Sequence, residues 1–134
     1  MIGMDIARSG LAASMMRLNA SASNVANADS VGSTPAKAAS ANPGQAPYQP
    51  ITVNQQAMKT GGVTTTYAKV QPGSVLRYEP SSSQADAQGM VAAPSVDPVD
   101  ETVQQIVAKS DFQANIAVVR VGDEMEKSAI DILA

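Results

Sequence analysis

The chain has no cysteine and no histidine among its 134 residues. The lack of cysteine excludes disulfides and thiolate nucleophiles, and the lack of both removes the commonest zinc ligands. Histidine is also the commonest general base and the usual side chain that changes charge near neutral pH. We therefore expect neither an enzyme nor a bound metal or cofactor.

Large aromatic side chains are scarce as well. The sequence has no tryptophan, one phenylalanine and three tyrosines, against 23 alanines. Because large aromatic residues usually fill globular cores, a self-sufficient compact core is not expected. The net charge of -3 and a pI near 4.7 argue against nucleic acid as a partner. No apolar run approaches the ~18 residues of a transmembrane helix, and MIGMDIARSG lacks the regions of a cleaved secretory signal.

Composition divides the chain into two ends and a middle. Residues 30–96 hold seven of the eight prolines, six of the nine glycines and six charged residues. Residues 1–29 carry four charges and no proline, and residues 97–134 carry eleven charges and one proline. This division predicts that helices over 1–29 and 97–134 pair into one core domain, with residues 30–96 inserted as a loop and a short β-hairpin.

A heptad-like apolar stripe runs along the first helical segment. Its period of 3.5 residues is typical of a helix that packs along another helix. The stripe consists of Met4, Leu11, Met15, Leu18, Ala22 and Val25. Helix breakers follow at Asn27, Asp29, Gly32 and Pro35, so we expect a helix of about 25 residues, roughly 37 Å long.

The second helical segment has a clear start signal. Asp97 suits the N-cap, Pro98 suits the first helical position, and Asp100 and Glu101 complement the positive end of the helix dipole. One long helix is predicted from about residue 98 to residue 133. Its apolar face consists of Val103, Ile106, Val107, Ala114, Ala117, Val118, Val121, Met125 and Ile132.

The two helical segments predict a mainly α fold in which the long terminal helices pair as an antiparallel coiled coil. Between them, YQPITVN, GGVTTTYAKV and SVLRYEP are rich in β-branched and aromatic residues and indicate short strands. Gly61 and Gly62 lie where a turn is needed, which favours an antiparallel β segment over 51–79. Residues 36–47 have few large apolar side chains and are predicted to form a loop.

Two motifs have both a chemical and a structural interpretation. The carboxylates of DPVDE are the densest acidic cluster, but they lack histidine and the spacing of a calcium loop, and helix capping explains them better. KTGGV lacks the spacing of a phosphate-binding loop, so a hairpin turn is the preferred interpretation.

Three longer motifs resemble those of flagellar axial proteins. LNASASNVANADS is similar to the N-terminal motif of those proteins, in which a helix ends in a Leu-Asn…Ser-Asn-Leu-Ala-Asn-Ala run. LRYEPSSSQADAQGMVAAPSVDPVDE resembles the segment before the C-terminal helix of the C-type proximal-rod family. DFQANIAVVRVGDEMEKSAIDIL resembles that family's closing helix. The resemblance covers nearly the whole chain, and residues 76–101 select the C type.

The resemblance implies a structural subunit of the bacterial flagellar basal-body rod, which crosses the periplasm and transmits torque from motor to hook. It also implies export through the flagellar type III apparatus without a cleaved signal peptide. The implied partners are further copies of the chain, other rod proteins, and basal-body ring and export-gate components, with no small-molecule substrate.

Small residues such as Ala20, Ala22 and Ala26 are then expected to let helices of neighbouring subunits approach closely, and Asn24 and Asn27 to supply hydrogen bonds at the turn. The residues expected at the assembly interface are Met4, Leu11, Met15, Leu18, Ala22, Asn24, Val25, Asn27, Val107, Ala114, Asn115, Val118, Val121, Met125 and Ile132.

A second hypothesis is a helical export adaptor or chaperone-like binding module. Such a module has to fold stably alone, and the long insert rich in proline and glycine argues against that. Removing the gene and inspecting cells for flagella separates the two hypotheses.

Overall fold

The computed structural model of the protein describes residues 2–39 and 44–133. Its elements, in chain order, are α1 (Ile2–Ala26), α2 (Pro35–Ala38), β1 (Ile51–Ala57), β2 (Val63–Lys69), β3 (Ser74–Tyr78), β4 (Met90–Pro94) and α3 (Pro98–Leu133). The fold is helix-rich with a small β part, as the sequence predicts.

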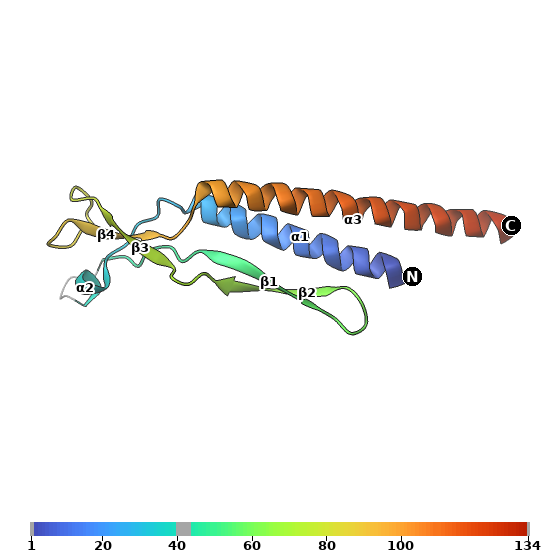
Figure 1. The fold of residues 1–134 in the computed structure, drawn as a ribbon, viewed down its shortest axis with the longest axis horizontal. Coiled ribbons are helices and arrows are strands. Elements are labelled where there is room, and N and C mark those ends of the chain that lie inside the picture. The colour runs from blue at the N-terminus through green and yellow to red at the C-terminus, as the bar shows by residue number, and fades with distance from the viewer. Residues whose placement is uncertain (1, 40–43, 134) are drawn as a thin grey trace.

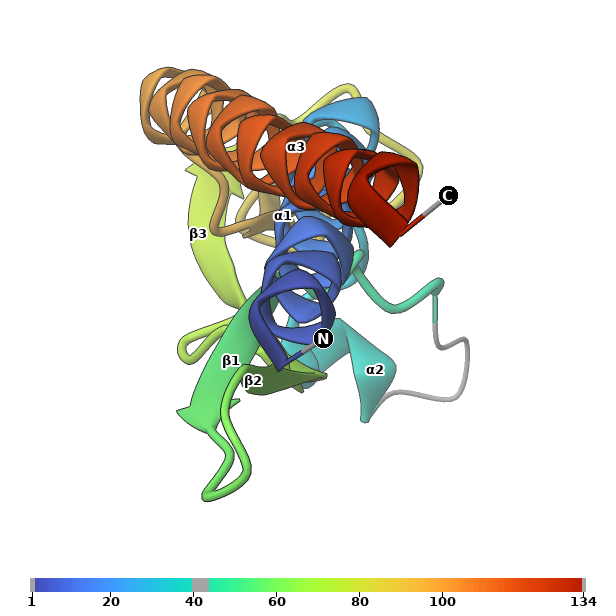
Figure 2. The ribbon, with the colours of Figure 1, turned by 90° about the vertical axis from the view of Figure 1, so that its right-hand side faces the viewer.

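The two long helices lie side by side and run in opposite directions, so both ends of the chain lie at the same end of the molecule (Figure 1). Viewed along the long axis, α1 lies between α3 and the strands β1 and β2 (Figure 2). With 36 residues against 25, α3 is the longer helix, and its C-terminal part extends beyond the start of α1 (Figure 1).

Both long helices end or begin at the predicted signals. The Val99 N–H donates to Asp97 Oδ1 at 2.8 Å, and the Glu101 N–H donates to the Asp97 carbonyl at 3.0 Å. Asp97 therefore caps α3, which is the role predicted for it. At the end of α1, Asn27 Nδ2 donates to the Ser23 carbonyl at 2.9 Å, which closes the last turn.

The predicted antiparallel β segment is present. Strands β1 and β2 pair with Ile51 opposite Lys69 and Ala57 opposite Val63. Gly61 and Gly62 have φ of 90° and 83°, a left-handed conformation that glycine adopts without a steric penalty. The turn therefore falls where the sequence predicts it.

A second hairpin, formed by β3 and β4, was only half predicted. SVLRY was expected to be a strand, but its partner MVAAP was not, because three small or ring-constrained residues give a weak strand signal. The inner strand β4 is buried, and its Ala92 exchanges two main-chain hydrogen bonds with Gly32, of 2.9 and 2.8 Å.

The predicted loop over 36–47 begins with one helical turn. This turn, α2, has Thr34 as its N-cap and Pro35 at its first position. Four residues give too short a periodic pattern to be recognised in the sequence. Residues 40–43 of the predicted loop lie outside the described residues.

Candidate functional site

Small side chains form most of the buried face of α1. Ala7, Ser14 and Ser21 are buried and recur every seven residues. Gly10 lies opposite Asn115 of α3, and a Cβ at Gly10 would lie only 2.6 Å from Asn115 Oδ1. Since the side chains at a helix contact set the distance between the axes, these small residues allow the two helices of one chain to approach closely.

The same close approach occurs near the open end of the helix pair. A Cβ at Gly122 would lie 2.7 Å from Met4 Cγ, and Met4 is buried. Met4 is therefore covered by α3 of its own chain. Ala20 is also buried within the chain, whereas Ala22 and Ala26 are exposed.

Polar groups tie the two helices together at their other end. The Ser21 hydroxyl donates to the Glu101 carbonyl at 3.0 Å and accepts from Gln105 Nε2 at 3.2 Å. Arg17 and Asp111 form an ion pair of 3.1 Å across the same contact. These polar residues at the contact between α1 and α3 were not predicted, although the heptad spacing of the small residues was visible in the sequence.

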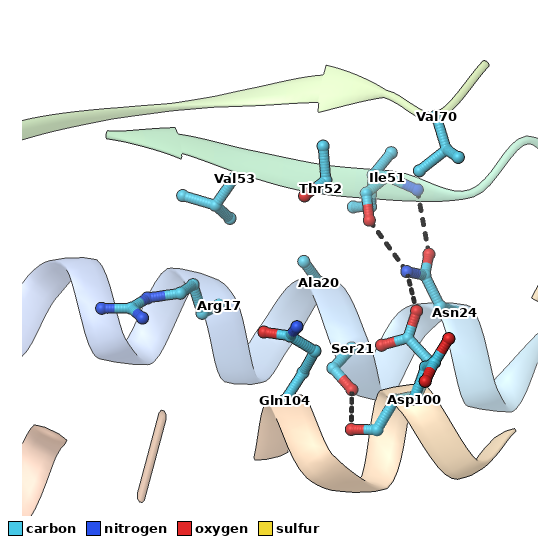
Figure 3. A pocket seen from close by; sticks show the side chains of 11 residues that line it. Arg17, Ala20, Ser21, Asn24, Ile51, Thr52, Val53, Val70, Asp100 and Gln104 are labelled. Atoms are coloured by element: carbon cyan, nitrogen blue, oxygen red, sulfur yellow. Dashed lines mark hydrogen bonds between the residues drawn. The ribbon is translucent and has the colours of Figure 1, made fainter. Parts of the chain in front are cut away.

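Asn24 joins three elements through one side chain (Figure 3). Its Nδ2 donates to the Ile51 carbonyl at 2.8 Å and to Glu101 Oε1 at 2.7 Å. Its Oδ1 accepts from the Ile51 N–H at 2.9 Å and from the Tyr48 hydroxyl at 3.1 Å. The amide therefore pairs with β1 as another strand would, while it also holds the first turn of α3.

Two residues expected at the assembly interface are thus interior residues of the chain. Asn24 is 3% exposed and Met4 is also buried, so little of either side chain faces solvent in the single chain. Asn24 was expected to bond at the turn after α1, but its partners lie on β1, on α3 and in the segment before β1. Asn27 does bond at that turn.

Most of the residues predicted at the assembly interface are exposed or partly exposed in the single chain. Leu11, Asn27 and Asn115 are partly exposed. The other members of the predicted set are exposed: Met15, Leu18, Ala22 and Val25 on α1, and Val107, Ala114, Val118, Val121, Met125 and Ile132 on α3. The exposed surface of the helix pair therefore carries most of the larger apolar side chains of the predicted faces.

Two apolar grooves interrupt this surface. One, of about 410 Å³, is lined by Met15 and Leu18 of α1 and by Ile106 and Phe112 of α3, among others. The other, of about 440 Å³, is lined mainly by Met4, Val118, Val121 and Met125, with small residues beside them. Grooves of this kind accept apolar side chains, and their lining offers no set of groups for acid–base or nucleophilic chemistry.

An acidic side chain stabilises the loop between β3 and β4. Asp86 accepts hydrogen bonds from the Met90 and Gln88 N–H groups, both at 3.0 Å, and from the Thr34 hydroxyl at 2.9 Å. The Met90 N–H contributes most to lowering the pKa of Asp86, and Thr34, Gln88 and the nearby charge of Lys37 lower it further. Asp86 thus links this loop to the N-cap of α2.

In the part of the chain that the structure describes, no helix is both long and apolar enough to cross a lipid bilayer. The long helix α3 and its capping residue Asp97 together carry eleven charged side chains, which agrees with that finding.

Comparison with known proteins gives a consistent family. Residues 87–132 match the family described as flagellar basal body rod FlgEFG protein C-terminal. The chain is 42% identical over 127 residues to the flagellar basal-body rod protein FlgC of Salmonella typhimurium, with 90% of this chain and 88% of the relative covered.

More distant relatives carry the same name. The FlgC protein of Agrobacterium fabrum is 33% identical, with 96% of this chain and 91% of the relative covered. That of Aquifex aeolicus is 31% identical, with 84% and 81% covered. These relatives are named as rod proteins rather than as enzymes, and the comparison covers most of the length of each relative. The chain therefore belongs to the FlgC family of flagellar basal-body rod proteins.

Proposed function

We propose that this rod subunit assembles by burying the exposed apolar faces of α1 and α3 against further copies of itself and against other flagellar rod proteins. The exposed stripe on each helix carries the proposal. Exposed apolar surface that is continuous along two helices normally marks an interaction site, and the grooves beside Leu18 and Val121 fit apolar side chains of a neighbour.

In this proposal residues 1–29 and 97–134 act as one antiparallel coiled-coil core domain, and residues 30–96 form the insert. The 3.5-residue spacing of the exposed stripes supports packing against further helices. Contacts between different patches of identical subunits repeat into open helical assemblies, so stripes on both α1 and α3 suit a rod. Closely packed helices would make the shaft stiff enough to transmit torque from motor to hook.

We further propose that the chain reaches a periplasm-spanning rod through the flagellar type III apparatus, without a cleaved signal peptide. Its helix pair has few large buried side chains, since the buried apolar residues are alanines and Met4 over the part of α1 and α3 whose burial is described, residues 3–26 and 98–132. Such a chain unfolds at little cost, which suits passage through a narrow channel. Export-gate and basal-body ring components are then expected to contact it. No observation favours an export adaptor or chaperone.

The test is a pair of charge substitutions with matched controls. Leu18 and Val121 are 42% and 52% exposed in the single chain, so an aspartate there keeps contact with water before assembly. Once the site is buried by a neighbour, the same charge costs several kcal/mol. Leu18→Asp and Val121→Asp should therefore preserve export and abolish swimming.

Asn19→Asp and Gln113→Asp are the controls, because both residues are exposed and each change alters the net charge equally. Export is measured by immunoblotting of cell fractions, and assembly by electron microscopy of isolated basal bodies. Normal swimming in Leu18→Asp cells would show that the α1 stripe is not an interface.

A further inference from the structure

Among the described residues, three of the four outer strand edges of the two hairpins are hydrogen-bonded at one residue each. Ile51 on β1 pairs with the Asn24 amide, and Ala92 on β4 pairs with the main chain of Gly32. On β2, the Val63 N–H donates to the Ser9 hydroxyl at 3.1 Å. An uncovered strand edge is a ready template for another chain, and covering it is the usual protection.

The edge of β3 has no such cover within the described residues. Hydrogen bonds from Ser95 N–H to the Gly73 carbonyl (3.1 Å) and from Glu79 N–H to the Gly89 carbonyl (2.9 Å) set which residues face β4. Because bonded and non-bonded pairs alternate in an antiparallel ladder, the main-chain groups of Leu76 point away from β4.

The main-chain groups of Ser74 and Tyr78 also point away from β4, because these residues lie two positions before and after Leu76. Leu76 and Tyr78 are 63% and 68% exposed. Neither proline nor lysine occurs in this strand to block pairing. The β3 edge thus presents three sets of outward main-chain groups beside a large aliphatic and an aromatic side chain.

We propose that β3 of one subunit pairs with β2 of a neighbouring copy of this chain and joins their hairpins into one sheet. This inference rests on the proposed assembly into a rod. The partner that this edge recognises is an extended strand. Such a strand binds through main-chain hydrogen bonds, and every second side chain along it contributes specificity.

Strand β2 is the preferred partner because its Tyr67, which is 50% exposed, has outward main-chain groups beyond the one edge contact at Val63. The outer edges of β1 and β4 are bonded at Ile51 by Asn24 and at Ala92 by Gly32. Pairing of β3 with itself would make a two-fold contact that closes on two subunits, whereas contact between β3 and β2 repeats without closing. Only the second kind of contact extends along a rod.

The part of the β2 edge beyond Val63 also matches the edge of β3. Hydrogen bonds from Met58 N–H to the Gly62 carbonyl (3.0 Å) and from Val70 N–H to the Pro50 carbonyl (2.9 Å) turn the main-chain groups of Thr65 and Tyr67 outward. An antiparallel pairing with Tyr67 opposite Leu76 places Thr65 opposite Tyr78. Pairs of aromatic and aliphatic or β-branched residues of this kind stabilise neighbouring strands.

Because the chain has no cysteine, introduced cysteines give a clean test. Directly opposite, hydrogen-bonded residues of antiparallel strands have Cα atoms about 5.5 Å apart, within the roughly 4.4–6.8 Å that a disulfide spans. Tyr67→Cys and Leu76→Cys chains are expressed together in cells lacking the native gene, and basal bodies are isolated under oxidising conditions. We expect a cross-linked dimer from the mixture and none from either variant alone.

The matched control replaces Tyr67→Cys with Thr66→Cys, since Thr66 is exposed but its main chain faces β1. Absence of the dimer in the Tyr67→Cys mixture, or an equal yield with Thr66→Cys, would overturn the proposal. So would a dimer from Leu76→Cys alone, which would indicate pairing of β3 with itself. Cross-linking of Leu76→Cys to a different rod protein would show that β3 pairs with that protein, and it would overturn pairing with a second copy of this chain.

A second variant separates this edge from the helix surface. Leu76→Pro removes an outward N–H while leaving the hydrogen bonds to β4 intact, and proline is tolerated at such an edge position. Leu76→Val keeps the N–H and serves as the control. We expect loss of swimming for Leu76→Pro and normal swimming for Leu76→Val. Normal swimming of Leu76→Pro cells would overturn pairing at β3, and Val121→Asp in the same assay reports independently on the helix surface.

Discussion

Asn24→Ala removes the side chain that joins α1, α3 and the first hairpin. Four hydrogen bonds are lost: two from its Nδ2, to Ile51 and Glu101, and two to its Oδ1, from Ile51 and Tyr48. Counting about 1 kcal/mol for each neutral bond and about 2 kcal/mol for the bond to the carboxylate gives an upper limit of about 5 kcal/mol.

The expected loss is smaller than this limit. A cavity of about 250 Å³ lies beside Asn24, between Arg17, Ile51 and Glu101, and water entering it can replace part of the lost bonding (Figure 3). We therefore expect a decrease of about 3 kcal/mol in the free energy of unfolding, or roughly 10 °C in melting temperature for a chain of this size.

The assay is thermal unfolding followed by circular dichroism, with all variants at one protein concentration, high enough for helix to form. Asn19→Ala is the control, since Asn19 is exposed on the same helix and surface changes usually stay within about 0.5 kcal/mol. Asn24→Asp should be at least as damaging as Asn24→Ala, because it places a second carboxylate beside Glu101. Equal melting temperatures for Asn24→Ala and Asn19→Ala would refute the role assigned to this amide.

Three further predictions concern the fold of the single chain. At low concentration both terminal helices should be largely unfolded, because they bury few large side chains; full helix content with a concentration-independent melt in circular dichroism would contradict this. Gly10→Val should destabilise the helix pair by about 1–3 kcal/mol in urea titrations because the new side chain meets Asn115, whereas Gly3→Ala, in open space, should not. The folded state lowers the pKa of Asp86, so its stabilising effect is present above the ordinary value of 3.8 and is lost as the pH falls through the lower folded value. Asp86→Asn should therefore weaken the dependence of the unfolding free energy on pH below the ordinary value of 3.8. An unchanged dependence in that range would exclude this role for Asp86.

Local signals in the sequence placed most of the secondary structure. Asp97 and Pro98 define the start of α3 through capping, which depends only on neighbouring residues. The paired glycines at 61 and 62 define the first hairpin turn because few other residues adopt positive φ. The strand β4 and the single turn α2 were missed, since alanine-rich or four-residue segments carry little local signal and depend on their contacts with Gly32 and Thr34.

The assignment of faces could not be made from the sequence. A 3.5-residue period describes both the exposed residues Leu18 and Val25 and the buried series at Ala7 and Ser14, which lies on another side of the same helix. Periodicity shows that a helix has neighbours, but it does not show which face contacts its own chain.

By itself, the sequence determined the family of this protein and the bounds of its long helices. Each of these depends on local residue order. Only the tertiary structure decided that glycine, alanine, serine and the Asn24 amide hold the helix pair together, while most of its larger apolar side chains remain outside. The physical reason is that a close helix contact requires small side chains within the chain, which leaves the bulkier ones on the surface.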